Sequence, residues 1–473
     1  MKRLAGRGGI SWVMAILVFA LVNFALSADC QAVSQSTWQL IGPGGGGHST
    51  SLIVDHSDPK VLFTSINCGG VRRSVDGGQS WDICNDGFDY ENLGIRAHKV
   101  TALAQHPTNA QVLLAALQDG QIVASSDRGE KWSLSYNMPG TAVGQSFSYF
   151  TFDPKDPDVV YTSVGGSIDR LLTPVGTENE DRRQTKLTRG YILKGQRQPN
   201  NQWKWVVIGE LQSSNRTPLN SYSCGVNPQE TSELFFVTSG GLYRGKLEGE
   251  KVSPQPVDHL KSGLPAASDF DGGKMVFDPR RKGRVYLSVM KLGNPKGGFF
   301  RSDDAGRTWR KMTRGLDTQR SNYFDIELDP IDDRVVYLAQ FREKSKDEKA
   351  SGGLYRSNDE GESWTNITQF RNFEWGWKAV RKNRFGVNYI ALSQQKPLTL
   401  YIATNVGQIF STKEPGAPSP KWKQITTRSV GPERWATTGL EAIALPQSIE
   451  IDPAHPEVLY IAYGDHGIFK SED

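Results

Sequence analysis

The chain has 473 residues, of which 37% are hydrophobic and 22% charged, and 49 are glycine. This composition is that of a globular protein and excludes a collagen-like, disordered or multi-span membrane chain. The aromatic content of 10%, combined with so much glycine, favours β-structure with many tight turns.

The first 27 residues have the order of a secretory signal peptide. Lys2, Arg3 and Arg7 precede an apolar run, and small residues allow cleavage after Ser27. The alternative is an uncleaved membrane anchor, because the apolar run is close to the length of a span. Cleavage predicts a secreted or periplasmic protein, with residues 28–36 as a linker.

Charge argues against nucleic acid as a partner. Loss of the three leader cations reduces 55 basic residues to 52, against 51 acidic ones, a net charge of +1. A nearly neutral protein has no extended field with which to attract a polyanion. Local basic runs are then expected to be solvated loop charge.

A short pattern, Ser-x-Asp-x-Gly-x-x-Trp, recurs along the chain. Full copies occupy residues 74–81, 125–132, 302–309 and 357–364, and a degraded copy begins at Ser411. In such a turn the Asp carboxylate accepts backbone N–H groups, and the Gly adopts a φ that a Cβ would penalise. The Trp is expected to fill the gap between neighbouring sheets.

A second phrase, an Asp-Pro-like turn leading into a β-branched and aromatic run, also repeats. Its starts lie at residues 55, 106, 153, 227, 278, 329, 393 and 452. Four short strands in each unit of ~50 residues predict an all-β chain, a β-propeller of four-stranded antiparallel blades. Eight starts favour eight blades, with seven as the alternative, and a β-solenoid would need shorter and more regular periods.

The propeller is expected to span residues 37–473, with a polar insertion at 167–189 that forms a mobile loop or a lid over one face. Residues 37–41 read as an outer strand separated from its blade, and the chain ends inside another copy of the turn. Either the early strand completes the last blade and closes the ring, or the chain is shortened at Asp473.

The four cysteines, Cys30, Cys68, Cys84 and Cys224, have no metal-binding spacing, and no metal or other cofactor is expected. Cys68 and Cys84 flank a predicted hairpin turn almost symmetrically. They are expected either to form a disulfide or to remain two buried free thiols.

The recurring turn is the Asp-box, and the repeats resemble the BNR/Asp-box propeller superfamily. That resemblance implies that the box aspartates are structural and that ligands bind near the axis of the ring. The Gly464-Asp465-His466-Gly467 stretch also resembles the catalytic segment of xyloglucanase-type glycoside hydrolases, which place one carboxylate from each of two propellers in a cleft. The resemblance makes Asp465 a catalytic candidate, and the alternative is an ordinary turn aspartate.

The second carboxylate of those enzymes lies in a Thr-Asp-Ile-Gly-Gly phrase. The matching stretch here is Ile66-Asn67-Cys68-Gly69-Gly70, with Asn67 where the aspartate would be. An amide cannot act as the acid, base or nucleophile that glycosidic cleavage requires. Asn67 is therefore retained as a ligand-binding candidate only.

Aromatic side chains supply the remaining candidates. Trp375 and Trp377 stand beside a basic run, and Trp435 precedes the Asp465 strand. Indole faces stack on sugars, whereas the alternative is packing between blades. The leading hypothesis is an exported propeller that binds a polysaccharide or a protein partner on an axial face. The competing hypothesis is a glycoside hydrolase acting on xyloglucan or another β-glucan through Asp465.

Overall fold

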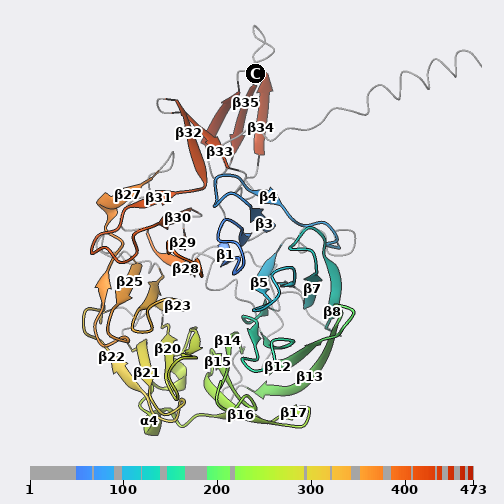
Figure 1. Ribbon diagram of the computed structural model, residues 1–473, viewed down its shortest axis with the longest axis vertical. Coiled ribbons are helices and arrows are strands. Elements are labelled where there is room, and N and C mark those ends of the chain that lie inside the picture. Colours follow the sequence, from blue (N-terminus) through green and yellow to red (C-terminus); the bar gives the residue numbers. More distant parts are fainter. Residues whose placement is uncertain are drawn as a thin grey trace, which may run out of the picture. The chain divides into compact units, whose positions relative to one another are not determined.

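The structure is a computed structural model in which strands dominate (Figure 1). It divides into two units, Met1–Gly42 and Pro43–Asp473, and every described residue belongs to the second unit. The described residues are 49–66, 69–89, 99–118, 120–138, 146–165, 189–212, 219–291, 296–319, 322–341, 352–375, 385–405, 408–431, 434–438, 446–451, 459–463 and 467–471. Within these ranges the helical segments are α4 (His259–Ser262) and the 3-10 turns η2 (Ala267–Asp269) and η3 (Phe370–Asn372).

Seven sheets of at least four strands follow one another along the chain, each a blade whose four main strands pair antiparallel in sequence order. Blade 1 consists of β1 (Ser49–Val54), β2 (Leu62–Ile66), β3 (Gly70–Ser74) and β4 (Asp82–Ile83). Blade 2 consists of β5 (Val100–Gln105), β6 (Leu113–Leu117), β7 (Gln121–Ser125) and β8 (Ser133–Asn137). Blade 3 consists of β10 (Thr151–Phe152), β11 (Val159–Gly165), β12 (Arg189–Arg197) and β13 (Trp203–Gln212), with β9 (Ser146–Phe147) also paired to β11.

Blades 4 to 7 complete the series. Blade 4 consists of β14 (Ser221–Val226), β15 (Glu233–Thr238), β16 (Gly241–Glu248) and β17 (Lys251–Val252), with β18 (Gln255–Pro256) paired to β16. Blade 5 consists of β19 (Met275–Phe277), β20 (Val285–Val289), β21 (Gly298–Ser302) and β22 (Arg310–Met312), and blade 6 of β23 (Tyr323–Leu328), β24 (Val336–Gln340), β25 (Gly353–Ser357) and β26 (Thr365–Asn366). Blade 7 consists of β28 (Val387–Leu392), β29 (Leu400–Thr404), β30 (Ile409–Thr412) and β31 (Trp422–Gln424), with β27 (Phe373–Glu374) parallel to β31.

The blades form a closed ring, because the strand that comes first in the sequence of each blade, which is β9 in blade 3, contacts the corresponding strand of the next blade. Contacts run from β1 to β5, β9, β14, β19, β23 and β28 in turn, and β28 contacts β1 again. This is a seven-bladed β-propeller, so the alternative of seven blades is right and the favoured count of eight is wrong. The eighth sequence unit forms a separate three-stranded sheet of β34 (Pro446–Ile451), β35 (Leu459–Tyr463) and β36 (Gly467–Ser471), preceded by the hairpin of β32 (Thr427–Gly431) and β33 (Arg434–Thr437).

A shared hydrophobic core explains why the ring closes after seven blades. Leu52 on β1 and Trp81 of blade 1 lie in one buried cluster with Tyr389 on β28, Ile409 on β30 and Ile425 of blade 7. Burial of aromatic and aliphatic side chains on both sides of this contact removes apolar surface from water. An eighth blade would have to separate β1 from β28.

The recurring Ser-x-Asp-x-Gly-x-x-Trp segments, called box turns below, join the third strand of a blade to its fourth. In the copy after β21, Asp304 Oδ1 accepts hydrogen bonds from Arg307 N at 3.0 Å and Thr308 N at 2.8 Å. Ser302 Oγ donates to the same carboxylate at 2.7 Å and accepts from Gly306 N at 2.9 Å. The carboxylate thus satisfies the donors of a tight turn, which is the structural role that the sequence pattern predicts.

Box turns also connect neighbouring blades. The Trp309 N–H donates to Ser262 O at 2.7 Å, and equivalent bonds run from Trp132 N to Asp86 O and from Trp364 N to Arg314 O. The residue after each acceptor is a glycine with positive φ, and a Cβ there would lie 1.9–2.4 Å from the carbonyl oxygen of the same Trp (Gly87, Gly263 and Gly315). Only glycine permits this close approach.

Several sequence predictions lie outside the described residues. These are the signal peptide at 1–27, the linker at 28–36, the early strand at 37–41 and all of the insertion except Arg189, which begins β12. Cys84 is a buried free thiol, and Cys68 lies outside the described residues. No helix in the described part of the chain is long and apolar enough to cross a membrane.

Candidate functional site

A cavity of about 470 Å³ is lined by residues of the first strands of the ring and their flanking segments. This volume is in the range of small-molecule sites in proteins, roughly 300–1,000 Å³. Its lining mixes apolar side chains such as Leu52 and Met275 with a group of charged and phenolic ones. We refer to it as the axial cavity, and its polar cluster comprises Lys274, Asp325, Glu327, Tyr149 and Tyr389.

Lys274 forms an ion pair with each of two carboxylates. Its Nζ donates to Asp325 Oδ1 at 2.7 Å and to Glu327 Oε1 at 2.8 Å. Both carboxylates lie on β23, two positions apart, so the alternation of a strand directs them to the same face. Lys274 precedes β19, and the contact therefore joins blade 5 to blade 6.

Asp325 extends this contact to a third blade. Its Oδ2 accepts the Ile390 N–H of β28 at 2.8 Å, while Oδ1 also accepts the N–H of Ile326 at 3.0 Å. Both oxygens of the buried carboxylate are thus occupied by donors. A buried charge with several hydrogen bonds avoids the cost of desolvation without partners.

The electrostatics of the cluster favour a charged lysine. Burial by itself lowers the pKa of Lys274, but the charges of Asp325 and Glu327 outweigh it and raise that pKa above its ordinary value. Burial raises the pKa of Glu327, and the neighbouring Lys274 opposes this only in part. Glu327 is therefore the member of the cluster that takes up a proton at a higher pH than an ordinary glutamate.

Two tyrosines complete the cluster. Lys274 Nζ lies 5.4 Å from the centroid of the Tyr149 ring, a cation–π contact, and the Tyr149 and Tyr389 centroids are 6.4 Å apart in an edge-to-face arrangement. Burial raises the pKa of both phenols, so both stay protonated at neutral pH. The Tyr149 hydroxyl is buried and interacts with the side chain of Tyr389.

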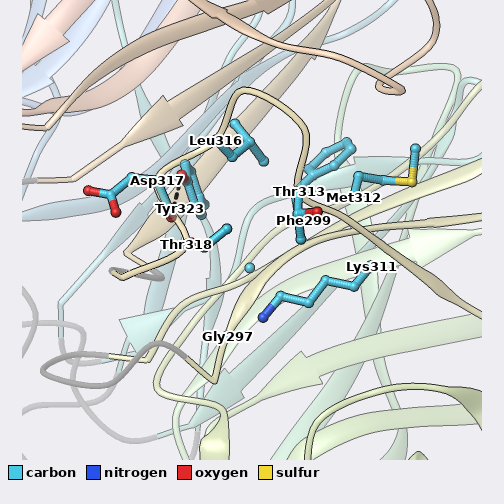
Figure 2. A pocket seen from close by; sticks show the side chains of 10 residues that line it. Gly297, Phe299, Lys311, Met312, Thr313, Leu316, Asp317, Thr318 and Tyr323 are labelled. Carbon is cyan, nitrogen blue, oxygen red and sulfur yellow. Dashed lines mark hydrogen bonds between the residues drawn. The ribbon is translucent and has the colours of Figure 1, made fainter.

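A second cavity, between blades 5 and 6, is too small for an organic ligand. Its volume is about 10 Å³, close to the minimum for one water molecule. Figure 2 shows Phe299, Met312 and Leu316 around it, with the Tyr323 hydroxyl donating to Asp317 O at 3.0 Å. It does not qualify as a candidate site.

The structure describes only part of the site predicted from the sequence. Asp465, Asn67 and Trp377 lie outside the described residues, and for Trp435 only its backbone position on β33 is described. Asn67 lies between β2 and β3, where Ile66 pairs with Gly70. Asp465 lies between β35 and β36, where Tyr463 pairs with Gly467. Both residues thus belong to the connection between the second and third strands of a sheet.

Trp375 is described in full, and its ring packs among aromatic side chains. The ring centroid lies 5.0 Å from Phe373, 5.4 Å from Phe410 and 5.8 Å from Phe385. Gln408 Nε2 donates to its carbonyl oxygen at 3.0 Å. These contacts are of the kind expected if Trp375 serves to pack the fold, which is the alternative to sugar binding. A role of Trp375 in sugar binding stays a prediction.

Sequence reasoning missed the whole axial cluster. The only signal was the alternation in Tyr323-Phe324-Asp325-Ile326-Glu327-Leu328, where two carboxylates interrupt a buried, otherwise apolar strand. Lys274 stood in a loop-like Gly-Gly-Lys segment and carried no signal of its own. Within the described ranges, no group of three or more His, Cys, Asp or Glu side chains is placed to hold a metal ion.

Comparison with known proteins finds similarity to xyloglucanases. No family model matches the chain. The chain is 24% identical over 408 residues to a xyloglucanase of Hypocrea jecorina, covering 80% of this chain and 44% of that protein. It is 33% identical over 396 residues to a xyloglucanase of Paenibacillus sp, covering 76% of this chain and 36% of that protein. The chain thus spans less than half the length of these relatives.

Solved structures agree on the fold. An ancestral GH74 enzyme superposes with a TM-score of 0.66 at 16% identity, covering 93% of this chain and 55% of that one. The GH74 xyloglucanase from Xanthomonas campestris gives a TM-score of 0.59 at 17% identity, covering 92% of this chain and 60% of that one. Together these similarities support a β-propeller of the xyloglucanase type.

Proposed function

We propose that this chain acts as a glycoside hydrolase of the xyloglucanase type, on xyloglucan or a related β-glucan. The observation that carries the proposal is the similarity to xyloglucanases over 76–80% of the chain. It favours the hydrolase over the binding-only propeller that the sequence reading put first. Export through the leader at residues 1–27 belongs to the same proposal, because a polymeric substrate is reached outside the cell.

Asp465 is the carboxyl proposed to take part in cleavage. It is an acidic residue in a Gly-Asp-x-Gly context, between two strands whose ends pair directly on either side. A short connection of this kind restricts where a side chain can be held, which general acid or base chemistry requires. Its role would be to protonate the leaving oxygen or to activate water, with a second carboxyl for the other task.

A second candidate function is binding of the polysaccharide without turnover, and Asn67 favours it. Asn67 occupies the connection between β2 and β3 that corresponds to the one holding Asp465, and its amide cannot act as a general acid or base. Substrate recognition would survive such a replacement even where cleavage does not.

The test is release of reducing sugars from xyloglucan by the whole chain and by Asp465→Asn. A hydrolase should lose activity by a factor of roughly 10² or more in the variant, because the group that transfers the proton is gone. The matched control is Asp82→Asn, which changes an exposed aspartate on the outer strand β4 and should keep the parent rate.

Xyloglucan binding, measured by isothermal titration with the same proteins, separates the two candidates. Saturable binding with no release of sugar by the parent would overturn the hydrolase in favour of the binding propeller. Absence of both binding and release would remove xyloglucan as the ligand altogether.

A further inference from the structure

We propose that His259 is a proton-controlled latch: its neutral imidazole holds residues 258–270 against the start of β16, and a proton on the second ring nitrogen releases them. Residues 258–270, called the latch segment below, comprise α4, η2 and the residues around them. The proposal goes beyond the proposed function and does not depend on it, because it concerns blades 4 and 5 and not the connection that carries Asp465.

Two hydrogen bonds fix the protonation state of the His259 ring. Nδ1 lies 2.9 Å from Pro265 O within the latch segment, and a carbonyl oxygen only accepts, so Nδ1 carries the hydrogen. Nε2 accepts the Leu242 N–H of β16 at 3.1 Å, so Nε2 carries a lone pair. A proton added at Nε2 would point at another N–H, and the buried donor of Leu242 would lose its acceptor.

The surroundings of the ring leave it little room to turn toward another partner. His259 is 7% exposed, and its ring centroid lies 4.9 Å from that of Phe270. A Cβ on Gly241 would lie 2.4 Å from His259 Cε1, so the imidazole rests directly against the backbone of β16. A charged imidazole would therefore have to leave this position to regain contact with water.

Blades 1 and 6 place uncharged side chains where blade 4 places His259. In blade 1 the Val71 N–H of β3 donates to Asn85 Oδ1 at 2.7 Å. In blade 6 the Leu354 N–H of β25 donates to Thr368 Oγ1 at 2.9 Å. Each acceptor serves the second residue of a third strand, as His259 does. An amide or a hydroxyl does not gain a proton between pH 5 and 8, whereas an imidazole does, so in blade 4 a change of pH can remove the acceptor.

The charged groups near the ring are already paired. Asp258 is the carboxylate that acts on the ring, and it lies 3.1 Å from Lys261 Nζ. On η2, Asp269 lies 3.6 Å from Lys296 Nζ, and the first three residues of β16 are uncharged. Burial lowers the pKa of His259 below its ordinary value of 6.5, and the charge of Asp258 offsets this only in part.

Release of the latch segment would affect both blades that it joins. The Trp309 N–H of blade 5 donates to Ser262 O at 2.7 Å, and Leu264 and Phe270 lie in one buried cluster with Leu242 of blade 4. Because the folded-state pKa of His259 is the lower one, the stabilisation by the latch is present above pH 6.5. It is lost as the pH falls from there through the folded-state pKa.

Amide hydrogen exchange of the whole chain between pH 7.5 and pH 5, followed by mass spectrometry, tests the latch. After correction for the intrinsic pH dependence of exchange, we expect the latch segment and the start of β16 to exchange about tenfold faster at pH 5. Corrected exchange in β24 of blade 6 should stay the same. An equal acceleration in β24 would indicate unfolding of the whole ring and would overturn the proposal.

His259→Gln is the matched variant, because its amide oxygen can accept the Leu242 N–H but does not gain a proton. It should keep the latch segment protected at both pH values. His259→Phe keeps a ring and removes the acceptor, so its latch segment should exchange at pH 7.5 as fast as that of the parent at pH 5. The control is His56→Gln in blade 1, which should respond to pH as the parent does.

The ¹⁵N chemical shifts of the His259 ring in the parent chain give a test that needs no variant. We expect the neutral form with its hydrogen on Nδ1 at pH 7.5. Three further results would overturn the proposal: a ring that is charged or carries its hydrogen on Nε2 at pH 7.5, equal exchange of the latch segment at pH 7.5 and pH 5, or a pH response that persists in folded His259→Gln.

Discussion

At the scale of single residues, Asp55 of the first Asp-Pro-like turn stabilises the junction between blades 1 and 2. Asp55 is 1% exposed, accepts the Ser57 N–H at 2.8 Å and is paired with Arg128 Nε of blade 2 at 2.8 Å. Gln105 of blade 2 also donates to it at 2.8 Å. One carboxylate thus closes its own turn and joins two neighbouring blades.

This pairing predicts a pH-dependent contribution to stability. Burial raises the pKa of Asp55, but hydrogen bonds from Arg128 and Ser57 outweigh it and lower the pKa from 3.8 to about 2. Because the folded-state pKa is the lower one, the stabilisation is present above pH 4 and is lost as the pH falls toward 2. Asp55→Asn should therefore reduce the free energy of unfolding by about 2 kcal/mol at pH 7, and by much less near pH 2.

Urea unfolding at several pH values measures this difference, with the exposed Asp82→Asn as the control. A loss of stability in Asp55→Asn that stays the same from pH 7 to pH 2.5 would contradict the assignment, because it would show that the charge of the carboxylate contributes nothing.

At the scale of the element, two kinds of glycine in the turns differ in what a side chain would meet. Gly77 in the first box turn has a φ of 76° and open space around its Cβ position. Gly87 has a φ of 90°, and a Cβ there would lie 1.9 Å from the Trp132 carbonyl oxygen. Gly77→Ala should cost about 1 kcal/mol from backbone strain alone, and Gly87→Ala about 3 kcal/mol or more.

Urea or thermal unfolding of both variants measures the difference between strain and steric clash. The box turns at Arg128, Ala305 and Glu360 already place non-glycine residues at positive φ, at 64°, 59° and 60°, so the smaller cost is one that the fold tolerates. Equal costs at Gly77 and Gly87 would argue against the close approach between blades 1 and 2.

The elements were predictable from the sequence where their chemistry is local. The Asp304 carboxylate closes its turn with donors three and four residues ahead, so spacing alone reveals it. The number of blades was not predictable in this way, because β28 and β34 both lead into a copy of the Asp-Pro-like turn, at residues 393 and 452, and only the packing of β1 decides which strand closes the ring. The polar cluster of the axial cavity could not be predicted from the sequence for the same reason, because Lys274 contacts carboxylates 51 and 53 residues further along the chain.

At the scale of the whole molecule, the ring depends on one contact between segments far apart in the sequence. Ile425, 7% exposed, lies in the cluster that holds Leu52 and Trp81 of blade 1. A Cβ on Gly78 of blade 1 would lie 2.5 Å from Ile425 Cδ1, so the two blades are in close contact. Removing the apolar contacts of Ile425 should therefore destabilise blade 1 and blade 7 together.

Ile425→Ala should cost about 3 kcal/mol and should speed amide hydrogen exchange in both β1 and β28, although these strands are more than 330 residues apart. The matched control is Ile326→Ala, which removes the same atoms from a fully buried site between blades 5 and 6. It should speed exchange in β23 and leave β1 protected, because β1 has no side chain in that cluster. Unchanged protection of β1 in Ile425→Ala would mean that blade 1 is held by something other than blade 7, and the seven-bladed closure would be wrong.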